Sequence, residues 1–332
     1  MTLIAYSIAH FLTDAVCASA IFSSQEMIPY ILMYDLLAFS TQGITGIVAD
    51  VIKRYRYIAI AGGLMTALAA LLPIPVALKV CLIGIGNSTF HVGGGAAVLK
   101  GSSNKATPLG IFVAPGSMGL LLGMLFPSIM IYVSIALLLI SIGLIWMKEY
   151  QSIEPSKDSS TFSMSGINKK IFAFIIIAII LISVSVRSMA SYSISYPWKN
   201  TITLSILLGV FVMMGKAAGG FILDKIKAVP VIILSVLISG PVIAFLSSSI
   251  LPSLVGQFLI NCSMPLTLYM LYRILPDYPG FAFGLAASFL FPGMAVGLGL
   301  QLSNFIILLI FMSNAILLYI AVKIMKKGSI NV

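Results

Sequence analysis

Two short stretches of the sequence, GIVADVIKRYR at residues 46–56 and GFILDKIK at residues 220–227, share the pattern G-x-x-x-D with basic residues after it. The second stretch lies 174 residues after the first. The same shift aligns identical residues along much of the chain: Gly46 with Gly220, Asp50 with Asp224, Lys53 with Lys227, Asn87 with Asn261, Gly110 with Gly284 and Gly119 with Gly293. Glycines alone could match by chance in a Gly-rich chain, but one offset across Asp, Lys and Asn indicates an internal repeat.

The repeat lies in a chain that is too apolar to be a soluble protein. Of its 332 residues, 60% are hydrophobic and 8% are charged, whereas soluble domains carry about 25% charged residues. The mean hydropathy is +1.13. The three cysteines, Cys17, Cys81 and Cys262, lie within apolar runs and fit neither a disulfide framework nor a zinc site. We therefore expect an all-α polytopic membrane protein with no metal and no cofactor.

About twelve apolar segments approach the roughly 20 residues that a transmembrane helix needs. They lie near residues 3–22, 27–48, 57–73, 77–99, 107–125, 128–147, 170–194, 201–222, 229–247, 250–272, 280–299 and 302–323. The repeat divides them into two pseudo-symmetric six-helix bundles in the same orientation. Parallel repeats of this kind occur in transporters whose substrate binds near the bilayer midplane between the halves.

The predicted bundles cover residues 1–147 and 170–325, joined by a polar, Ser-rich cytoplasmic linker at 148–169 and followed by a tail at 326–332. If the N-terminus is cytoplasmic, 15 basic residues lie on the inner side and two, Lys79 and Lys199, near the outer face. This asymmetry predicts cytoplasmic termini in the cell membrane. The net charge of +10 is then a record of membrane insertion, and we expect no nucleic-acid partner.

Ionisable side chains inside a span are costly and mark functional sites by default. His10 and Asp14 in the first span are four residues apart and share a helix face, as do Asn87 and His91 in the fourth. Asp35 lies in the second span. A buried carboxyl can carry a proton, and imidazole titrates near neutral pH. We predict proton coupling by Asp14, His10, His91 and Asp35, with Asp14 favoured over Asp35 as the carrier.

Arg187 is the one base deep within a span, and its permanent charge suits a carboxylate or phosphonate of the substrate. We predict a substrate site formed by Arg187, Asn87, Asn261 and Tyr269. The alternative is a static buried network in which Asp14 or Asp35 neutralises Arg187. Single histidines are also often purely structural.

The repeated G-x-x-x-D loop resembles the signature of the major facilitator superfamily, G-x-x-x-D-R/K-x-G-R-R/K. The resemblance implies a conformational latch in which the Asp caps a neighbouring helix N-terminus and pairs with the bases beside it. The residues concerned are Gly46, Asp50, Arg54, Gly220, Asp224 and Lys225. The first copy departs from the pattern at Val51 and lacks the later Gly. The fifth span is similar to the family's antiporter motif at Gly101, Gly110, Pro115 and Gly119, which implies export by exchange.

A narrower similarity is to the fosmidomycin-resistance branch of this superfamily. It rests on AHFLTD at 9–14, GIGNSTFH at 84–91 and GIFVAPGSMG at 110–119, and covers mainly the first five spans. Val92 stands where that branch usually has Pro. The resemblance implies antibiotic export in exchange for protons and supports the roles of Asp14 and His91, but it does not identify the substrate.

These patterns predict a secondary transporter that moves by alternating access and exports a small organic, anionic or amphipathic molecule in exchange for protons. Its expected partners are that molecule, protons and the lipid bilayer, and we expect a monomer. The alternatives are a proton symporter or facilitator that imports a small metabolite on the same fold and, from another class, a polytopic membrane enzyme. The chain has no P-loop and no nucleophile elbow, so we expect no catalytic residue and no enzyme.

Overall fold

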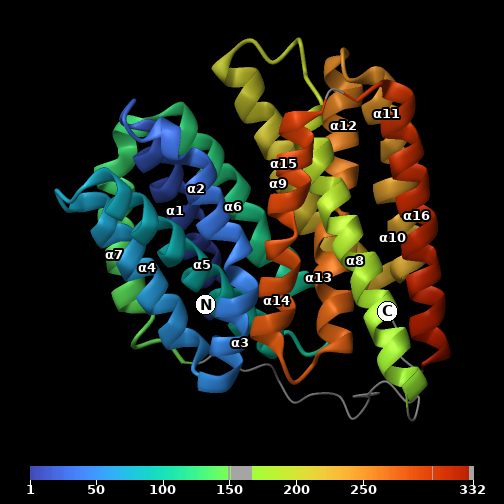
Figure 1. Ribbon diagram of the computed structural model, residues 1–332, viewed down its shortest axis with the longest axis horizontal. Helices are drawn as coiled ribbons and strands as arrows, with labels where there is room; N and C mark the ends of the chain where they lie inside the picture. Colours follow the sequence, from blue (N-terminus) through green and yellow to red (C-terminus); the bar gives the residue numbers. More distant parts are fainter. Residues whose placement is uncertain (149, 151–166, 301, 329–332) are drawn as a thin grey trace. The chain divides into compact units, whose positions relative to one another are not determined.

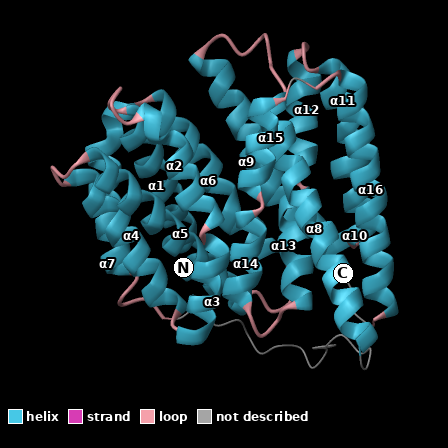
Figure 2. Ribbon diagram, viewed as in Figure 1, coloured by secondary structure: helices cyan, strands magenta, loops and turns pink. Residues whose placement is uncertain are grey.

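The computed structural model describes residues 1–148, 150, 167–300 and 302–328, and every described segment of regular structure is helical (Figures 1 and 2). Glu149 and residues 151–166 of the predicted linker lie outside the described residues. The same holds for residues 329–332 of the predicted tail.

Among the described residues, ten helical segments are long and apolar enough to cross a membrane. Two shorter apolar helices, Tyr55–Leu71 and Pro127–Gly143, fall where the sequence predicts the third and sixth spans. The ten long segments are Thr2–Phe22, Ile28–Ile52, Val76–Gly101, Thr107–Leu125, Lys170–Ser193, Ile202–Ile226, Ala228–Leu246, Ile250–Ile274, Pro279–Gly299 and Asn304–Lys327. The fold prediction is therefore confirmed, and the chain is a multi-pass membrane protein.

The chain forms two compact units. The first comprises residues 1–101, 111–151 and 277–288, of which 149 and 151 are not described, so it contains most of the first six segments and one helix of the eleventh. Its helices are α1 (Thr2–Phe22), α2 (Ile31–Asp35), α3 (Gln42–Ile52), α4 (Tyr55–Leu71), α5 (Val76–Gly101), most of α6 (Thr107–Leu125), α7 (Met130–Gly143) and α14 (Pro279–Ser288), with short turns η1 (Ile28–Tyr30), η2 (Leu36–Ser40) and η3 (Pro127–Ile129).

The second unit comprises residues 102–110, 152–276 and 289–332, although its residues 152–166, 301 and 329–332 are not described. Its helices are α8 (Ile167–Ser193), α9 (Ile202–Ile226), α10 (Ala228–Ile232), α11 (Ser239–Leu246), α12 (Ile250–Asn261), α13 (Ser263–Ile274), α15 (Leu290–Gly299) and α16 (Asn304–Lys327), with the turn η4 (Ile233–Ile238). The first turn of α6 also packs here.

The interior of the first unit combines apolar side chains with close backbone contacts. Val16, Ile83 and Leu137 are fully buried in one cluster, which joins α1, α5 and α7. α4 and α5 approach closely because Gly62 has no side chain. A Cβ at this position would lie only 2.2 Å from the backbone of Phe90. Small residues at helix interfaces permit this approach in membranes, where the lipid is as apolar as the side chains.

The repeat is visible in the backbone. Lys53 directly follows α3 and Lys227 directly follows α9, and both residues have positive φ, of 58° and 67°. These two positions are equivalent in the 174-residue repeat. A residue with positive φ stops a helix because it turns the chain out of the helical path. Both copies of the motif are therefore followed by a positive-φ residue, although ψ differs between them, at 17° for Lys53 and 174° for Lys227.

Candidate functional site

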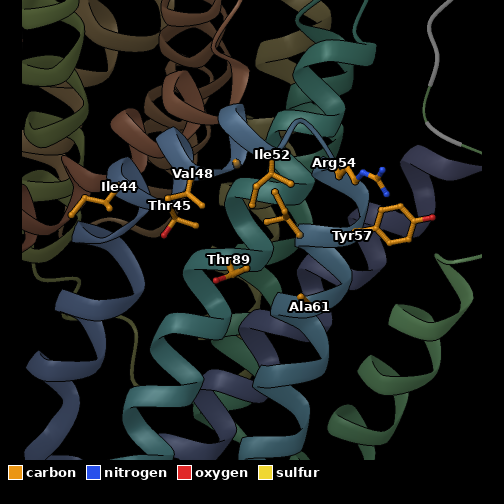
Figure 3. A pocket seen from close by; sticks show the side chains of 10 residues that line it. Ile44, Thr45, Val48, Ile52, Arg54, Tyr57, Ala61 and Thr89 are labelled. Carbon is orange, nitrogen blue, oxygen red and sulfur yellow. The ribbon is translucent and has the colours of Figure 1, made fainter.

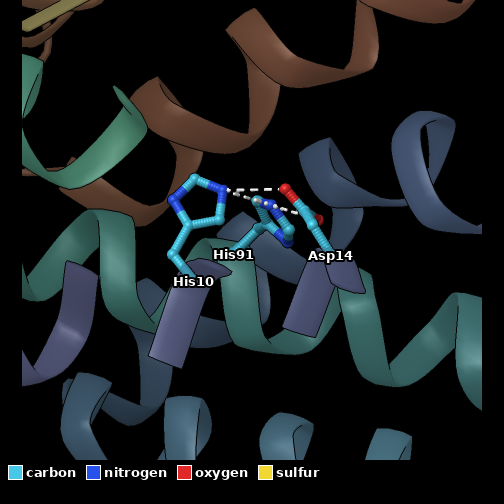
Figure 4. Close-up of side chains that lie close together, drawn as sticks. All are labelled: His10, Asp14 and His91. Carbon is cyan, nitrogen blue, oxygen red and sulfur yellow. Dashed lines mark hydrogen bonds and ion pairs between the residues drawn. The ribbon is translucent and has the colours of Figure 1, made fainter. Parts of the chain in front are cut away.

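Three ionisable side chains of the first unit converge, as Figure 4 shows. His10 and Asp14 lie one turn apart on α1, and His91 reaches them from α5. The Nε2 atoms of His10 and His91 are 2.8 Å apart. Each Nε2 also lies near the Asp14 carboxylate, at 3.3 Å for His10 and 3.4 Å for His91. The structure thus brings together three of the four residues predicted for proton coupling.

The other ring nitrogens fix the protonation pattern of both histidines. His10 Nδ1 lies 2.8 Å from the carbonyl oxygen of Phe112, and His91 Nδ1 lies 2.9 Å from that of Asn87. A carbonyl oxygen only accepts hydrogen bonds, so each Nδ1 carries a proton and donates it. In the neutral form of each ring, Nε2 is then a bare acceptor.

Two neutral rings would therefore place two lone pairs and a carboxylate against one another. The 2.8 Å separation of the two Nε2 atoms is a hydrogen-bond distance, which requires a proton on one of them. That proton makes one ring an imidazolium, whose charge the adjacent Asp14 carboxylate balances. The observed geometry thus fits a cluster that holds one proton more than two neutral histidines and one carboxylate.

The same three atoms are also a possible metal site, since all ligand atoms lie within 4.8 Å of one another. Ligands about 2.0 Å from a tetrahedral Zn²⁺ lie about 3.3 Å apart. The two contacts with Asp14 match that spacing, but the 2.8 Å between the histidine nitrogens is shorter. The distances therefore favour a shared proton over a shared metal ion.

Asn87 extends the cluster toward the second segment. Its Nδ2 donates to Asp14 Oδ1 at 3.3 Å and lies 3.2 Å from the hydroxyl of Tyr34 and 3.3 Å from the sulfur of Cys17. Asn87 Oδ1 is buried and has no hydrogen-bond partner among the described residues. The sequence predicts Asn87 as a substrate ligand, and the structure places it beside the predicted proton carrier.

A glycine of α6 closes the cluster on one side. A Cβ on Gly116 would lie 2.4 Å from His10 Nε2 and 2.5 Å from Asp14 Oδ2, so only glycine leaves room for the two side chains in this arrangement. Further along the same helix, Gly119 and Gly123 pack on the backbone of α1. The sequence comparison missed Gly116 because the antiporter pattern does not include that position.

The other predicted motif residues of the fifth span lie in two environments. Pro115 is inside α6, and Gly119 packs where its Cβ would be 2.0 Å from the carbonyl of Phe11. Gly110, in the second unit, packs on the backbone of α9 at Lys216. Gly101 ends α5 and lies against the ring of Tyr150. The expected close helix packing is present at Gly110 and Gly119, whereas Gly101 packs on a residue outside the helices.

Asp35, the fourth residue predicted for proton coupling, does not join the cluster. It ends α2 next to the π-helical turn η2 and forms no hydrogen bond or ion pair with the described residues. Its neighbour Tyr34 contacts Asn87 instead. Adjacent side chains on a helix point about 100° apart, so Tyr34 and Asp35 cannot both face the interior. Tyr34 is buried, and Asp35 is only half-buried.

Arg187 lies in the second unit, on α8, and is 7% exposed. Its Nη1 donates to the hydroxyls of Ser263 and Thr267 on α13, both at 3.4 Å. Within the described part of the second unit no carboxylate pairs with it. A guanidinium has five N–H donors, so two long bonds to neutral hydroxyls leave most of its charge uncompensated there.

The remaining predicted substrate residues have other partners in the second unit. Asn261 is buried and donates to the carbonyl oxygen of Gln257 at 2.8 Å. Tyr269 donates to the carbonyl oxygen of Asn104 at 2.8 Å and accepts from Arg273 at 2.9 Å. These bonds occupy the Tyr269 hydroxyl, so the structure does not bring it to Arg187 Nη1.

Asp50 caps a helix of its own unit. Its carboxylate accepts from the backbone N–H groups of Gly280 and Phe281, at 2.8 and 2.7 Å, in the first turn of α14. The hydroxyl of Tyr55 donates to it at 2.9 Å. A Cβ on Gly46 would lie 2.4 Å from the carbonyl oxygen of Gly280, so the glycine of the motif permits the approach. A carboxylate at a helix N-terminus satisfies free N–H groups and the helix dipole.

Asp224 makes the equivalent contact in the second unit. It accepts from the backbone N–H groups of Ala106 and Thr107, at 2.7 and 2.9 Å, where α6 begins. These donors precede those of Asp50 by the same 174 residues that separate the two carboxylates. Gly220 packs against Ala106 as Gly46 packs against Gly280. Asp50 is buried, whereas Asp224 is exposed.

One part of the sequence interpretation is wrong here. Neither carboxylate forms an ion pair with the bases beside it, Arg54 and Lys225, among the described residues. Backbone N–H groups already occupy both oxygens of Asp50 and of Asp224. The bases are exposed, and an exposed ion pair would add little because water screens it.

No protein-family model matches the chain, and no curated protein matches it in sequence. Solved structures do match its fold. The human organic anion transporter MFSD10 (TETRAN) has a TM-score of 0.68 at 12% identity, over 97% of this chain and 98% of that chain. The Escherichia coli fucose:proton symporter FucP has a TM-score of 0.65 at 14% identity, over 96% of each chain. Another structure of FucP, in the outward conformation, has a TM-score of 0.63 at 12% identity, over 97% and 98%. The chain thus has the fold of major facilitator superfamily transporters.

Proposed function

We propose that this protein is a proton-coupled secondary transporter that exports a small organic anion by alternating access. The observation that carries the proposal is the His10–Asp14–His91 cluster, whose geometry fits one shared proton. The fold supports a transporter rather than an enzyme, because the similar solved structures are transporters.

The proton in the cluster links charge to helix packing. With the proton present, the two rings and the carboxylate attract one another and hold α1 against α5. When the proton leaves, three acceptors face one another at 2.8–3.4 Å, and their repulsion favours a different arrangement of these helices. A proton that binds one arrangement better than another shifts the population toward it. Asp14 has the most accessible side chain of the three, at 17%, and is therefore the expected point of exchange with water.

Arg187 supplies the affinity for an anion. A buried base without a carboxylate partner is destabilising unless a counter-ion binds and balances its charge. A carboxylate or phosphonate of the substrate would accept the remaining guanidinium N–H groups, with the hydroxyls of Ser263 and Thr267 beside it. The fold neighbour MFSD10 is an organic anion transporter, which agrees with this substrate class.

Asp50 and Asp224 serve as the latches of the transport cycle in this proposal. Each holds the first turn of one helix through two backbone N–H groups, and such contacts can break and form again without a chemical step. The residues Gly46 and Gly220 permit each approach. Arg54 and Lys225 have a lesser role, since no ion pair joins them to the latch carboxylates.

The direction of transport rests on α6. Gly116, Gly119 and Gly123 of α6 form a glycine seam against α1. This seam, with Pro115 inside the helix, supports the similarity to antiporters and hence export in exchange for protons. The distribution of basic residues supports cytoplasmic termini in the cell membrane.

The rival function is import by proton symport on the same fold. Dissipation of the proton gradient should raise the cellular content of substrate for an exporter and lower it for a symporter.

The test uses everted membrane vesicles that contain a pH-sensitive dye and an imposed proton gradient. Small monocarboxylates, dicarboxylates, phosphonates and neutral compounds are added one at a time, each with and without EDTA. A transported anion should release protons from the vesicles that contain the protein and not from vesicles that lack it. If no anion moves protons while neutral compounds do, the substrate class is wrong. If EDTA abolishes the signal, the cluster binds a metal ion rather than a proton.

A further inference from the structure

We propose that a groove on the first unit, between α3, α4 and α5, binds a phospholipid with an anionic head group. Figure 3 shows the groove, with Arg54 and Tyr57 at one side, Ile44 at the opposite side and Thr89 and Ala61 below the middle of the view. It has a volume of about 400 Å³. The residues that line it are Ile44, Thr45, Val48, Ala49, Ile52, Arg54, Tyr57, Ile58, Ala61 and Thr89.

The groove exists because α3 and α4 diverge after a very short connection. Only Lys53 and Arg54 join the two helices. The positive φ of Lys53 ends α3, and both α3 and α4 then pack on α5. Because α3 and α4 share a neighbour but have little contact with each other, a furrow remains between them over α5.

Away from Arg54 and Tyr57, the walls of the groove are mainly apolar. Ile44, Val48 and Ile52 are 69%, 51% and 50% exposed, so they face the surroundings of the bundle. The two threonine hydroxyls in the groove are already used within their own segments: Thr45 donates to Thr41 O at 3.0 Å, and Thr89 donates to Ile85 O at 2.7 Å. The third hydroxyl, of Tyr57, lies at the Arg54 end and accepts from Arg56 at 3.0 Å. Along the apolar walls an acyl chain would bury apolar surface, whereas polar partners are concentrated at the Arg54 end.

The head-group end of the groove is positive and uncompensated. Lys53 and Arg54 are exposed and form no ion pair with the described residues. The nearby carboxylate, Asp50, accepts from α14 and from Tyr55 instead. Arg56 by contrast is occupied, because it donates to Met147 O and to the hydroxyl of Tyr57. Charge complementarity therefore selects a phosphate with net negative charge over a zwitterionic head group.

The position of the groove gives its occupant a consequence for α3. Ile44, Val48 and Ile52 lie on one face of this helix, and Gly46 and Asp50 lie on the face that packs against α14. A lipid in the groove would support α3 from the side opposite to α14. The binding itself does not depend on the transport activity proposed above.

The test is native mass spectrometry of the full chain after incorporation into nanodiscs of equal phosphatidylglycerol and phosphatidylcholine. We expect the wild type to retain phosphatidylglycerol in preference to phosphatidylcholine. Arg54→Gln should lower this retention about fivefold, since one base near a phosphate contributes about 1 kcal/mol. Ala61→Phe, which fills the groove without a change of charge, should lower it at least as much. Lys170→Gln removes an exposed base that does not line the groove, and it should retain the lipid.

Three results would overturn the proposal. The first is equal retention of the two lipids by the wild type, which would mean that the head group is not selected. The second is unchanged retention in both Arg54→Gln and Ala61→Phe, which would place the lipid elsewhere. The third is an equal loss in Lys170→Gln, which would show that the lipid responds to total charge and not to this groove.

Discussion

The Nε2 atoms of His10 and His91 lie 2.8 Å apart, and both rings donate their other N–H to a backbone carbonyl. Because the carbonyls fix the tautomers, one proton decides whether this contact attracts or repels. Neither ring can avoid the repulsion by exchanging its tautomer without losing a buried hydrogen bond. The proton state of the cluster is thereby tied to the packing of α1 and α5.

Replacement of one histidine tests this contact. We expect His91→Gln to lower gradient-driven transport about tenfold, because a charge-assisted hydrogen bond contributes about 1.5–3 kcal/mol. The His10–Asp14 pair, at 3.3 Å, should preserve some coupling. The measurement is initial transport rate in everted vesicles as a function of pH. Ile85→Ala, an exposed site on the same helix, is the control, and an equal rate in His91→Gln and wild type would contradict the prediction.

Gly116→Ala tests whether the close approach of α6 maintains the cluster. The added Cβ would lie 2.4 Å from His10 Nε2 and 2.5 Å from Asp14 Oδ2. Since these atoms are the ends of side chains, they can move away and the helices need not separate. We therefore expect at least about a tenfold loss of transport with little change in thermal stability. Gly143→Ala adds a Cβ where no atom lies within 4 Å and should behave as wild type. Normal transport by Gly116→Ala would refute the role of the seam.

The two capping carboxylates should differ in their effect on stability. Asp50→Asn replaces a carboxylate oxygen by an N–H donor that faces backbone N–H groups, which leaves a buried donor unpaired at a cost of about 1–3 kcal/mol. Asp224 is exposed, so water can replace its contacts and Asp224→Asn should cost less. The measurement is thermal unfolding in detergent. Asp277→Asn, an exposed carboxylate of the first unit, is the matched control. Equal midpoints for Asp50→Asn and Asp277→Asn would be inconsistent with the cap.

Arg187→Gln tests the anion site. Loss of a bidentate partner for a carboxylate should raise the apparent KM for the transported anion by at least about tenfold. Arg187→Lys keeps the charge but not the planar fork, and its apparent KM should lie between those of the wild type and Arg187→Gln. The measurement is the concentration dependence of uptake into everted vesicles. An unchanged KM in Arg187→Gln would exclude a direct contact between this side chain and the substrate.

Much of the fold follows from the sequence, because hydrophobic length and the 174-residue offset depend on local pattern. The spacing of four residues also places His10 and Asp14 on one helix face. The tertiary contacts depend on helix rotation, which no spacing reveals. The carbonyl of Phe112 as a partner of His10 and the contact of Tyr34 with Asn87 are of this kind.

Other features of the site could not be predicted from the sequence, because they also depend on how each helix is rotated and what surrounds it. Asp35 and Tyr34 are adjacent in sequence, and the rotation of the second segment selects Tyr34 for the interior. Gly116 carries no chemical group of its own, so its importance is visible only from the atoms that surround it. The resemblance of its motif implies a capping role for Asp50, but the identity of α14 as the capped helix requires the three-dimensional arrangement.

The most direct test of the central claim is transport by Asp14→Asn in everted vesicles with and without a proton gradient. Asparagine has a similar shape but cannot balance an imidazolium, so proton-driven accumulation should fall to the level of vesicles without the protein. Exchange of labelled for unlabelled substrate, which needs no net proton movement, should remain measurable and shows that the variant is folded. Full gradient-driven accumulation by Asp14→Asn would contradict the assignment of proton coupling to this cluster.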